Sequence, residues 1–425
     1  MQRVKFYTVG CKVNQYETQS IREQFIRFGF KAIDNGGSAD IYLINTCTVT
    51  QKADRDSRHL IHLTHRQNPQ AKILVTGCYT ELDSAEIAKI PGVTHIIKNK
   101  DKDRIIELFS QRNNESTKQR VNEHIGITNF SGHTRAFLKI HDGCNNFCAY
   151  CKVPLVRGAS RSRPLSSIVQ EAGQLVKNGF KEIVLCGICL GDYGKDLASP
   201  LNLVDVIEAL EETEGLLRIR LSSIEAGNIS DKLIEKIKES KKLCPHLHIP
   251  VQSGDNEILR KMNRSYGREA YVDLIKKIKN KIPQIAISTD VLVGFPGERE
   301  ENFQNTVKLI QEIAPLKVHI FSYSKRIGTC ASNFKDEVEL HIIKERVQRL
   351  LAIAEGCSLA YRKKFLNKRL DVLIESRSKE NPGFWEGHAD NYIKVLVISK
   401  KNLKNQLISL RLKKTVKGFI HADFS

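Results

Sequence analysis

Three cysteines stand close together in the middle of the chain, in the stretch Cys144-Asn-Asn-Phe-Cys148-Ala-Tyr-Cys151. They follow a glycine after a strand-like run, so three thiolates can face one metal centre. Zinc normally takes four ligands, and no fourth Cys or His stands at the usual spacing. A 4Fe-4S cluster can be held by three thiolates, which leaves one iron open. The alternative is a chance group of buried cysteines, although spaced thiols on a loop beside a glycine make a poor core.

The open iron of such a cluster can hold a small chelator, such as the amino and carboxylate groups of S-adenosylmethionine. Tyr150, just before the third cysteine, would then place an aromatic ring beside the bound adenine. The pattern resembles the radical S-adenosylmethionine superfamily, whose fold is typically a partial (β/α)6 barrel. The resemblance covers Arg135 to about Tyr323.

Three further cysteines share one position in the first part of the chain. Cys11, Cys47 and Cys78 each end a strand-like run, in TVGC, INTC and VTGC. The carboxyl ends of parallel strands meet at one edge of a sheet, so these thiols should converge although they are far apart in sequence. They either bind a second three-thiolate cluster or are buried separately, as cysteines often are. Three consecutive strands with the same ending favour the cluster.

The elements that must position the N-terminal cysteines lie in residues 1–112. Strand-like runs at 4–10, 41–46, 72–77 and 95–98 alternate there with helical patterns at 16–30, 52–66, 81–90 and 103–109. This alternation predicts a doubly wound parallel sheet. Residues 113–134 are polar without periodicity, which is typical of a linker.

Residues 135–366 alternate again, and residues 367–425 do not. Six strand-like runs begin at 135, 182, 217, 246, 286 and 317. Six β/α units are fewer than the eight of a closed barrel, so we expect a partial barrel followed by a long helix over 338–365. The last runs, at 369–376, 391–399 and 406–416, have no helix between them and predict a small all-β barrel. The fold class is therefore α/β with a C-terminal all-β barrel.

Two three-cysteine sites in this order, followed by a small β domain, resemble the methylthiotransferase family over nearly the whole chain. Its members have an N-terminal cluster domain, a radical domain and a C-terminal RNA-binding TRAM domain. The stretches GCKVNQYET and NTCTVT are most similar to the MtaB branch. That branch adds a methylthio group to carbon 2 of threonylcarbamoyladenosine at position 37 of tRNA. The isopentenyl-adenosine and ribosomal-protein branches usually have other residues at these places.

The resemblance implies a division of labour between two 4Fe-4S clusters. The central cluster would cleave S-adenosylmethionine to methionine and a 5′-deoxyadenosyl radical, which suits a C–H bond too weakly acidic for a side-chain base. The N-terminal cluster would carry the sulfur, and a second S-adenosylmethionine would supply the methyl group. An electron donor of the flavodoxin or ferredoxin type and a sulfur donor are implied as partners. The alternatives are methylthiolation of another tRNA adenosine or of a ribosomal protein, and a non-enzymatic iron–sulfur RNA-binding protein.

Polar residues that end barrel strands belong to the active face of such a barrel. The candidate contacts to cofactor or substrate are Ser222, Ser223, Glu225 and Gln252, although such residues also cap strand ends. The sequence departs from the usual family pattern at Cys186, Cys189, Ala226, Ser322 and Ile327. These departures bear on substrate fit rather than on the reaction class. A third metal site at Cys186 and Cys189 is disfavoured because two cysteines alone do not saturate a metal.

The chain is strongly basic, since Lys and Arg exceed Asp and Glu by 67 − 48 = 19. The excess predicts an anionic partner, or else a solvated basic surface. With the resemblance, the partner is a tRNA anticodon loop, whose unstacked base can enter a pocket. The candidate RNA contacts are Trp385, Tyr392, Lys413 and Lys414. Trp385 could instead fill the core of the small barrel, with the lysines on a solvated face.

No apolar core typical of a signal peptide occurs in residues 1–10, and no run of about 18 apolar residues occurs anywhere. In a reducing compartment, the eleven cysteines are not expected to form a disulfide framework, and those that are clustered would bind metal or act in catalysis. We therefore expect a cytoplasmic protein without a membrane partner.

Overall fold

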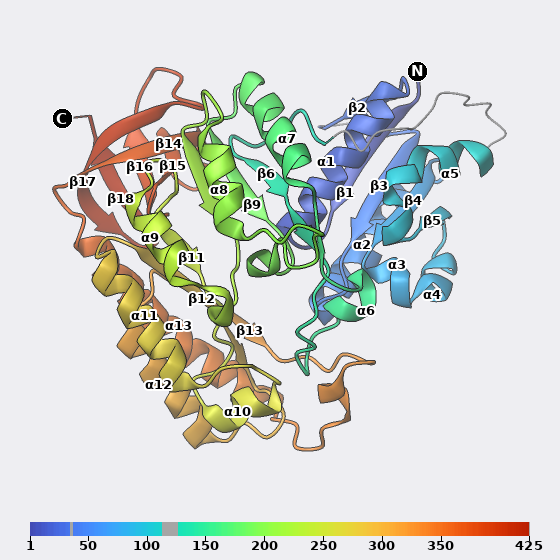
Figure 1. Cartoon of the computed structure of the whole chain (residues 1–425). Helices are drawn as coiled ribbons and strands as arrows, with labels where there is room; N and C mark the ends of the chain where they lie inside the picture. The colour runs from blue at the N-terminus through green and yellow to red at the C-terminus, as the bar shows by residue number, and fades with distance from the viewer. Residues whose placement is uncertain (35–36, 113–125, 425) are drawn as a thin grey trace.

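Five parallel strands form the first sheet, in the order β2-β1-β3-β4-β5 (Figure 1). The computed structural model describes residues 1–34, 37–112 and 126–424. The strands of this sheet are β1 (Arg3–Thr8), β2 (Lys31–Ile33), β3 (Ile41–Thr46), β4 (Lys72–Gly77) and β5 (Val93–Ile97). Its helices are α1 (Lys12–Arg27), α2 (Gln51–Gln67), α3 (Tyr79–Leu82), α4 (Ser84–Ala88), the 3-10 helix η1 (Asn99–Arg104) and α5 (Ile105–Arg112).

Helices cover both faces of the first sheet. Leu43 of β3 packs in a cluster with Phe25 of α1, whereas its neighbour Ile44 packs in a second cluster with Ile61 of α2. Successive side chains of a strand point to opposite faces, which explains why β3 is buried at every position. The predicted doubly wound parallel sheet is confirmed. The structure adds β2 and divides the helix predicted for 81–90 into α3 and α4.

Six parallel strands form an open barrel in the middle of the chain, in the order β6-β9-β10-β11-β12-β13. Two three-stranded sheets, β10-β9-β6 and β11-β12-β13, are joined by parallel bridges from Ile219 to Leu243 and from Ser223 to His248. The strands are β6 (Ala136–Lys139), β9 (Glu182–Cys186), β10 (Arg218–Leu221), β11 (His246–His248), β12 (Ala286–Val293) and β13 (Lys317–Ser322). The predicted partial barrel is therefore confirmed. A short hairpin, β7 (His141–Asp142) with β8 (Arg161–Ser162), lies beside it.

Helices line the outside of the open barrel (Figure 1). The long ones are α7 (Leu165–Lys177), α8 (Leu203–Glu211), α9 (Asp231–Glu239), α11 (Arg268–Lys281), α12 (Glu300–Ile313) and α13 (Leu340–Lys363). The short ones are α6 (Val153–Arg157), α10 (Asn256–Lys261), η2 (Leu190–Asp192), η3 (Ala226–Asn228) and η4 (Cys330–Asn333). The long helix predicted for 338–365 corresponds to α13.

Alternate residues of the barrel strands face its interior. The register pairs Ser288 with Lys317 and Asp290 with His319, and all four border an interior cavity. Their neighbour Val291 points the other way, into the apolar core beneath the helices. The inside of the barrel is consequently polar and charged.

Five strands close into a small barrel near the C-terminus, in the order β14-β15-β16-β18-β17. They are β14 (Arg369–Arg377), β15 (Phe384–Ala389), β16 (Lys394–Ile398), β17 (Leu407–Val416) and β18 (Phe419–Asp423). The predicted all-β barrel is confirmed, but β15 and β18 were not predicted. In β15, a Cβ on Gly387 would lie 2.2 Å from the backbone oxygen of Leu373, so the close approach of β14 requires a glycine that weakens the strand pattern.

The folded regions contact one another. Helix α1 lies against β6 of the open barrel (Figure 1). At the other side, Arg220 of β10 donates to the backbone oxygens of Asp390 at 2.9 Å and Ala389 at 3.2 Å, in the C-terminal barrel. Among the described residues, no helix is both long and apolar enough to cross a membrane.

The predicted linker spans 113–134, and its residues 113–125 lie outside the described residues. The remaining part packs on the folded regions. Ile127 is buried in the barrel core, and the amide of Thr128 donates to the carboxylate of Glu23 at 2.9 Å. This segment therefore ties α1 to the barrel.

Candidate metal-cluster sites and a basic pocket

The N-terminal cysteines lie at the carboxyl edge of the first sheet. Cys11 directly precedes α1, Cys47 follows β3 and Cys78 follows β4. The amide of Cys78 donates to the backbone oxygen of Thr46 at 3.0 Å, which sets the ends of β3 and β4 side by side. A Cβ on Gly10 would lie 2.7 Å from the Cβ of Cys47, so the loop that carries Cys11 runs directly against Cys47. The topology thus brings the three strand ends together.

Burial sets the acidity of two of these thiols. Cys47 and Cys78 are buried, whereas Cys11 is exposed. Burial, reinforced by Cys78, raises the pKa of Cys47 to about 12. Burial also raises the pKa of Cys78, although Arg157 and Lys102 oppose the shift. Thiolates at this edge therefore require positive charge nearby, which a bound metal supplies.

The central cysteines lie on the loop between β7 and α6, and an N–H group points at each sulfur. The sulfur–donor pairs are Cys144 with the amide of Asn146, Cys151 with the amide of Val153 and Cys148 with Nη1 of Arg264, each at 3.4 Å. Hydrogen bonds to cluster sulfurs stabilise their negative charge and tune the reduction potential. The loop is well suited to holding a cluster.

The distances between the cysteine sulfurs decide whether a triad could bind a single metal ion. Two ligands of one zinc ion, each about 2.3 Å from it, lie at most about 4.6 Å apart. In the described part of the chain, the set of three potential ligands whose atoms all lie within 4.8 Å of one another is His248, Asp290 and His319. Neither cysteine triad is that tight. Both triads are therefore too widely spaced to bind a single zinc ion with all three sulfurs.

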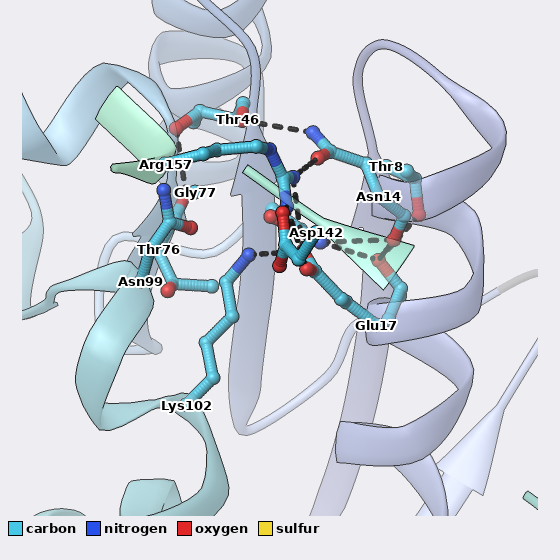
Figure 2. A network of polar contacts seen from close by, with 12 residues as sticks. Thr8, Asn14, Glu17, Thr46, Thr76, Gly77, Asn99, Lys102, Asp142 and Arg157 are labelled. Carbon is cyan, nitrogen blue, oxygen red and sulfur yellow. Dashed lines mark hydrogen bonds and ion pairs between the residues drawn. The ribbon is translucent and has the colours of Figure 1, made fainter. Parts of the chain in front are cut away.

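A buried ionic network joins the loops of the two triads (Figure 2). Arg157, at the end of α6, donates from Nη1 to Oε1 of Glu17 at 2.8 Å and from Nη2 to Oδ1 of Asn14. Asn14 in turn donates to the backbone oxygen of Thr46 at 3.0 Å, just before the second N-terminal cysteine. Burial opposes the ionisation of Glu17, yet Arg157 and Lys102 hold its pKa well below the usual range. The network fixes the two triads relative to each other.

Beside Cys148 lies a cavity of about 130 Å³. The predicted residue Glu225 lines it and forms an ion pair with Arg264. Arg264 and Asn228, which also line it, were not predicted. Neither follows a barrel strand directly, so the strand-end rule could not find them. Arg264 could have been found from the sequence because it belongs to the stretch HLHIPVQSGDNEILRKMNR, which resembles the family.

The other predicted contacts to a cofactor occupy different surroundings. Tyr150 is partly buried against an apolar cluster that includes Phe295. Gln252 has φ +69°, and its amide donates to the backbone oxygen of Asp290 at 2.8 Å. Ser222 is buried, and its Oγ has no hydrogen-bond partner within the described ranges. A buried hydroxyl without a partner at a cavity wall is the kind of group that a ligand satisfies.

A second cavity, of about 270 Å³, lies inside the open barrel and draws residues from all three folded regions. We call it the basic pocket. Lys12 comes from α1, Lys317 from β13 and Tyr392 from the C-terminal barrel. The predicted residues Ser222 and Ser223 line the basic pocket rather than the cavity beside Cys148.

The wall of the basic pocket contains an internal histidine–aspartate pair. Nε2 of His248 lies 3.0 Å from Oδ1 of Asp290, and its Nδ1 lies 3.1 Å from Oγ of Ser288. Burial and the neighbouring Lys317 lower the pKa of His319 to about 4. His319 is therefore neutral near pH 7.

The four predicted RNA contacts of the C-terminal region lie in three environments. Trp385 is buried in the core of the small barrel and its indole N–H donates to a backbone carbonyl at 3.2 Å. This is the core position that the sequence left open as an alternative. Tyr392 lines the basic pocket and stacks on His246, with ring centroids 4.6 Å apart. Lys413 and Lys414 are exposed on β17.

The two unusual cysteines of the barrel, Cys186 and Cys189, have different surroundings. Cys186 is fully buried at the end of β9. Cys189 accepts hydrogen bonds from the side-chain amides of Asn146 and Asn228 at 3.7 and 3.6 Å, and it contacts Cys144. Of the remaining departures, Ala226 is buried in η3, Ser322 ends β13 and Ile327 is exposed.

Comparison with known proteins identifies the families that share this architecture. The profile of the Radical SAM superfamily matches residues 138–310, and the Uncharacterized protein family UPF0004 matches residues 3–98. The solved structure of the radical S-adenosylmethionine methyltransferase TsrM from Kitasatospora setae is similar, with a TM-score of 0.55 and 14% identity over 76% of this chain and 73% of that one. The fold and the central cysteines define a radical S-adenosylmethionine protein, a class that uses a 4Fe-4S cluster and S-adenosylmethionine.

Curated relatives extend the likeness to nearly the whole chain. Threonylcarbamoyladenosine tRNA methylthiotransferase MtaB of Bacillus subtilis is 40% identical over 97% of this chain and 94% of its own length. Its namesake in Thermotoga maritima is 35% identical over 93% and 91%. The tRNA-2-methylthio-N(6)-dimethylallyladenosine synthase of Clostridium tetani is 34% identical over 96% and 93%. The chain belongs to the methylthiotransferase family, as the sequence motifs predicted.

Proposed function

We propose that this enzyme adds a methylthio group to carbon 2 of threonylcarbamoyladenosine at position 37 of tRNA. The observation that carries the proposal is the pair of cysteine triads, joined by the Arg157 network and accompanied by a basic pocket inside the barrel. The names of the similar proteins in B. subtilis and T. maritima support this substrate. The net charge of +19 supports an RNA partner.

Each cysteine triad holds one 4Fe-4S cluster in this proposal. The donor sets fit, because all six thiols are free and neither triad is tight enough for a single ion. The central ligands are Cys144, Cys148 and Cys151, and the N-terminal ligands are Cys11, Cys47 and Cys78. When bound, the clusters and S-adenosylmethionine supply one-electron and sulfur chemistry that side chains lack.

The residues of the chain position the reactants. The ion pair of Arg264 and Glu225 forms one wall of the cavity beside Cys148, where S-adenosylmethionine would bind, with Tyr150 and Gln252 as neighbouring contacts. Ser222 and Ser223 contact ligands from the basic pocket. An unstacked base of the anticodon loop enters this pocket, since a paired base could not reach the clusters. Lys413 and Lys414 contact the tRNA backbone, and Tyr392 contacts the entering nucleotide.

Two more partners are needed for turnover. A cluster held by Cys144, Cys148 and Cys151 would need an electron donor of the flavodoxin or ferredoxin type, and each product would consume one sulfur atom from a sulfur donor. The exposed Cys11 is the accessible corner of the N-terminal triad, which suits delivery of sulfur from outside.

Mass spectrometry of tRNA nucleosides from a deletion strain tests the function. We expect the methylthio form of threonylcarbamoyladenosine to disappear and to return with the wild-type gene, but not with Cys11→Ala. Loss of methylthio-dimethylallyladenosine instead would indicate the activity named for the C. tetani relative. An unchanged tRNA profile, with loss of a modified ribosomal protein, would reject the proposal. A protein that forms no 5′-deoxyadenosine under reducing conditions would be an iron–sulfur binding protein rather than an enzyme.

A further inference from the structure

The basic pocket carries far more positive than negative charge. Lys12, Arg135, Arg220 and Lys317 line it, and Asp290 is the one carboxylate among the described residues of its wall. The charge of Asp290 already faces His248, at 3.0 Å. The pocket as a whole is therefore built for an anion.

The two arginines are occupied by partners from behind the wall. Arg220 donates from Nε to Glu182 at 2.8 Å, and Arg135 donates from Nη2 to Glu375 at 3.1 Å. Both carboxylates lie outside the pocket lining. These arginines hold the floor of the pocket in place, and their charge is largely balanced.

The two lysines have no such partner. Within the described part of the chain, neither Lys12 nor Lys317 forms an ion pair or a side-chain hydrogen bond. They reach the pocket from different regions, α1 and β13. Both lysines act on His319 electrostatically, because each of them lowers the pKa of this histidine. Their ammonium groups are the unbalanced charges of the pocket.

We propose that Lys12 and Lys317 form a carboxylate-binding subsite that recognises the threonyl carboxylate of the substrate base. This inference rests on the proposed function and identifies the side chains that select the substrate. The threonylcarbamoyl group carries the one anionic group of the modified base, and its urea and hydroxyl groups match the neutral polar wall of His319 and Ser223. A base with a dimethylallyl group would place an uncharged group against the two lysines and leave both without a counter-charge.

A divalent cation is a poorer occupant of this pocket. His248, Asp290 and His319 are close enough to bind one ion. However, both ring nitrogens of His248 already face internal partners, Asp290 and Ser288. The two free lysines would also repel a cation at this place. A carboxylate satisfies the lysines and leaves the internal pair intact.

The test measures binding of short anticodon stem–loop RNAs to full-length, cluster-loaded protein by fluorescence anisotropy. Three RNAs are compared, which carry threonylcarbamoyladenosine, its methyl ester or plain adenosine. The variants are Lys317→Met, Lys12→Met and the conservative Lys317→Arg. Lys308→Met, an exposed lysine on α12, is the matched control for general loss of charge. Iron content is measured for each variant, since Lys12 adjoins Cys11.

We expect wild-type protein to bind the carboxylate RNA roughly tenfold more tightly than the ester RNA, as for a partly exposed ion pair. Lys317→Met and Lys12→Met should abolish this preference without weakening the ester RNA, and Lys317→Arg and Lys308→Met should keep it. Equal weakening of all three RNAs, or an unchanged preference, would overturn the subsite. The proposed function is judged separately, by whether the wild-type protein forms the methylthio product from the carboxylate RNA.

Discussion

Arg157 and Glu17 form an ion pair across the boundary between the first sheet and the open barrel, with Nη1 and Oε1 2.8 Å apart. Their side chains are 2% and 8% exposed. Arg157 follows the central cysteines, and Glu17 lies on the helix that begins after Cys11. The pair therefore joins the two regions that carry the triads, and both of its side chains are almost fully buried.

Replacement of Arg157 by methionine should weaken this boundary strongly. Glu17 would lose Arg157 while it remains buried, although Lys102 and Lys139 would still pair with it, so we expect the free energy of unfolding to fall by about 1.5–3 kcal/mol. Chemical denaturation of wild type and variant measures the difference. Arg349→Met removes an exposed pair with Glu300 and should change stability by less than about 0.5 kcal/mol. Equal effects of the two substitutions would contradict a special role for the buried pair.

Iron content should report the two triads independently. Anaerobic analysis of wild-type protein should give about eight iron atoms and eight sulfides per chain, since each cluster contains four of each. Simultaneous Cys11→Ala, Cys47→Ala and Cys78→Ala substitutions should halve both numbers. The isolated and exposed Cys330, changed to alanine, should leave them unchanged. Full iron retention in the triple variant would show that the N-terminal cysteines are not ligands.

The gathering of the N-terminal cysteines could be predicted because parallel topology alone sets where strands end. Cys11, Cys47 and Cys78 each follow a strand of one sheet, and the carboxyl ends of such strands share an edge. The six barrel strands were predictable for a similar reason, because each is followed by an amphipathic helix. Both results use only local patterns and the rules of strand connection.

The contacts between regions could not be predicted in this way. Glu17 and Arg157 are separated by most of the first sheet and the following segment, and no local pattern encodes how α1 docks on β6. The basic pocket likewise depends on three regions meeting. The sequence predicted Tyr392 only as a candidate RNA contact, and its stacking on His246 inside the open barrel could not be foreseen. Such positions follow from docking, which periodicity does not describe.

Acid should weaken the contact between the open barrel and the C-terminal barrel through Glu375. Burial opposes its ionisation, but His388 and Arg135 lower the pKa of Glu375 to about 2. Burial lowers the pKa of His388 as well, so His388 acts as a neutral hydrogen-bond donor and Arg135 supplies the charge. A lowered carboxylate pKa stabilises the folded state above the ordinary value of about 4.3. That contribution, at most about 3 kcal/mol, is lost as the pH falls from about 4.3 to 2.

The Glu375→Gln variant isolates this effect. It should be less stable than wild type at pH 7, and its melting temperature should fall less steeply between about pH 4.3 and 2 because the titrating group is absent. Thermal unfolding across a pH series measures both slopes. The exposed Glu257, which pairs with Lys261 on α10, gives a matched control as Glu257→Gln. Parallel pH curves for wild type and Glu375→Gln would show that the pKa of Glu375 is not lowered by folding.

A single methyl group at Gly143 should be enough to prevent assembly of the central cluster. Gly143 directly precedes Cys144 and has φ +71°, which is strained for any residue with a Cβ. A Cβ there would also lie 1.9 Å from the backbone oxygen of Ala159, which cannot move as a flexible side chain can. In Gly143→Ala the loop must shift, and with it the three sulfurs. We expect iron content to fall to about half and formation of 5′-deoxyadenosine to be lost.

Gly356→Ala is the matched control for this substitution. Gly356 lies in α13, where an added Cβ meets no atom within 4 Å, so alanine should raise helix stability by up to about 1 kcal/mol and leave iron unchanged. The Gly143→Ala protein could instead lose its iron from the N-terminal triad. Combining Gly143→Ala with the Cys11, Cys47 and Cys78 substitutions distinguishes the two cases. The combined variant should then bind almost no iron if Gly143 serves the central loop. Retention of about four irons in the combined variant would show that the central loop tolerates the methyl group.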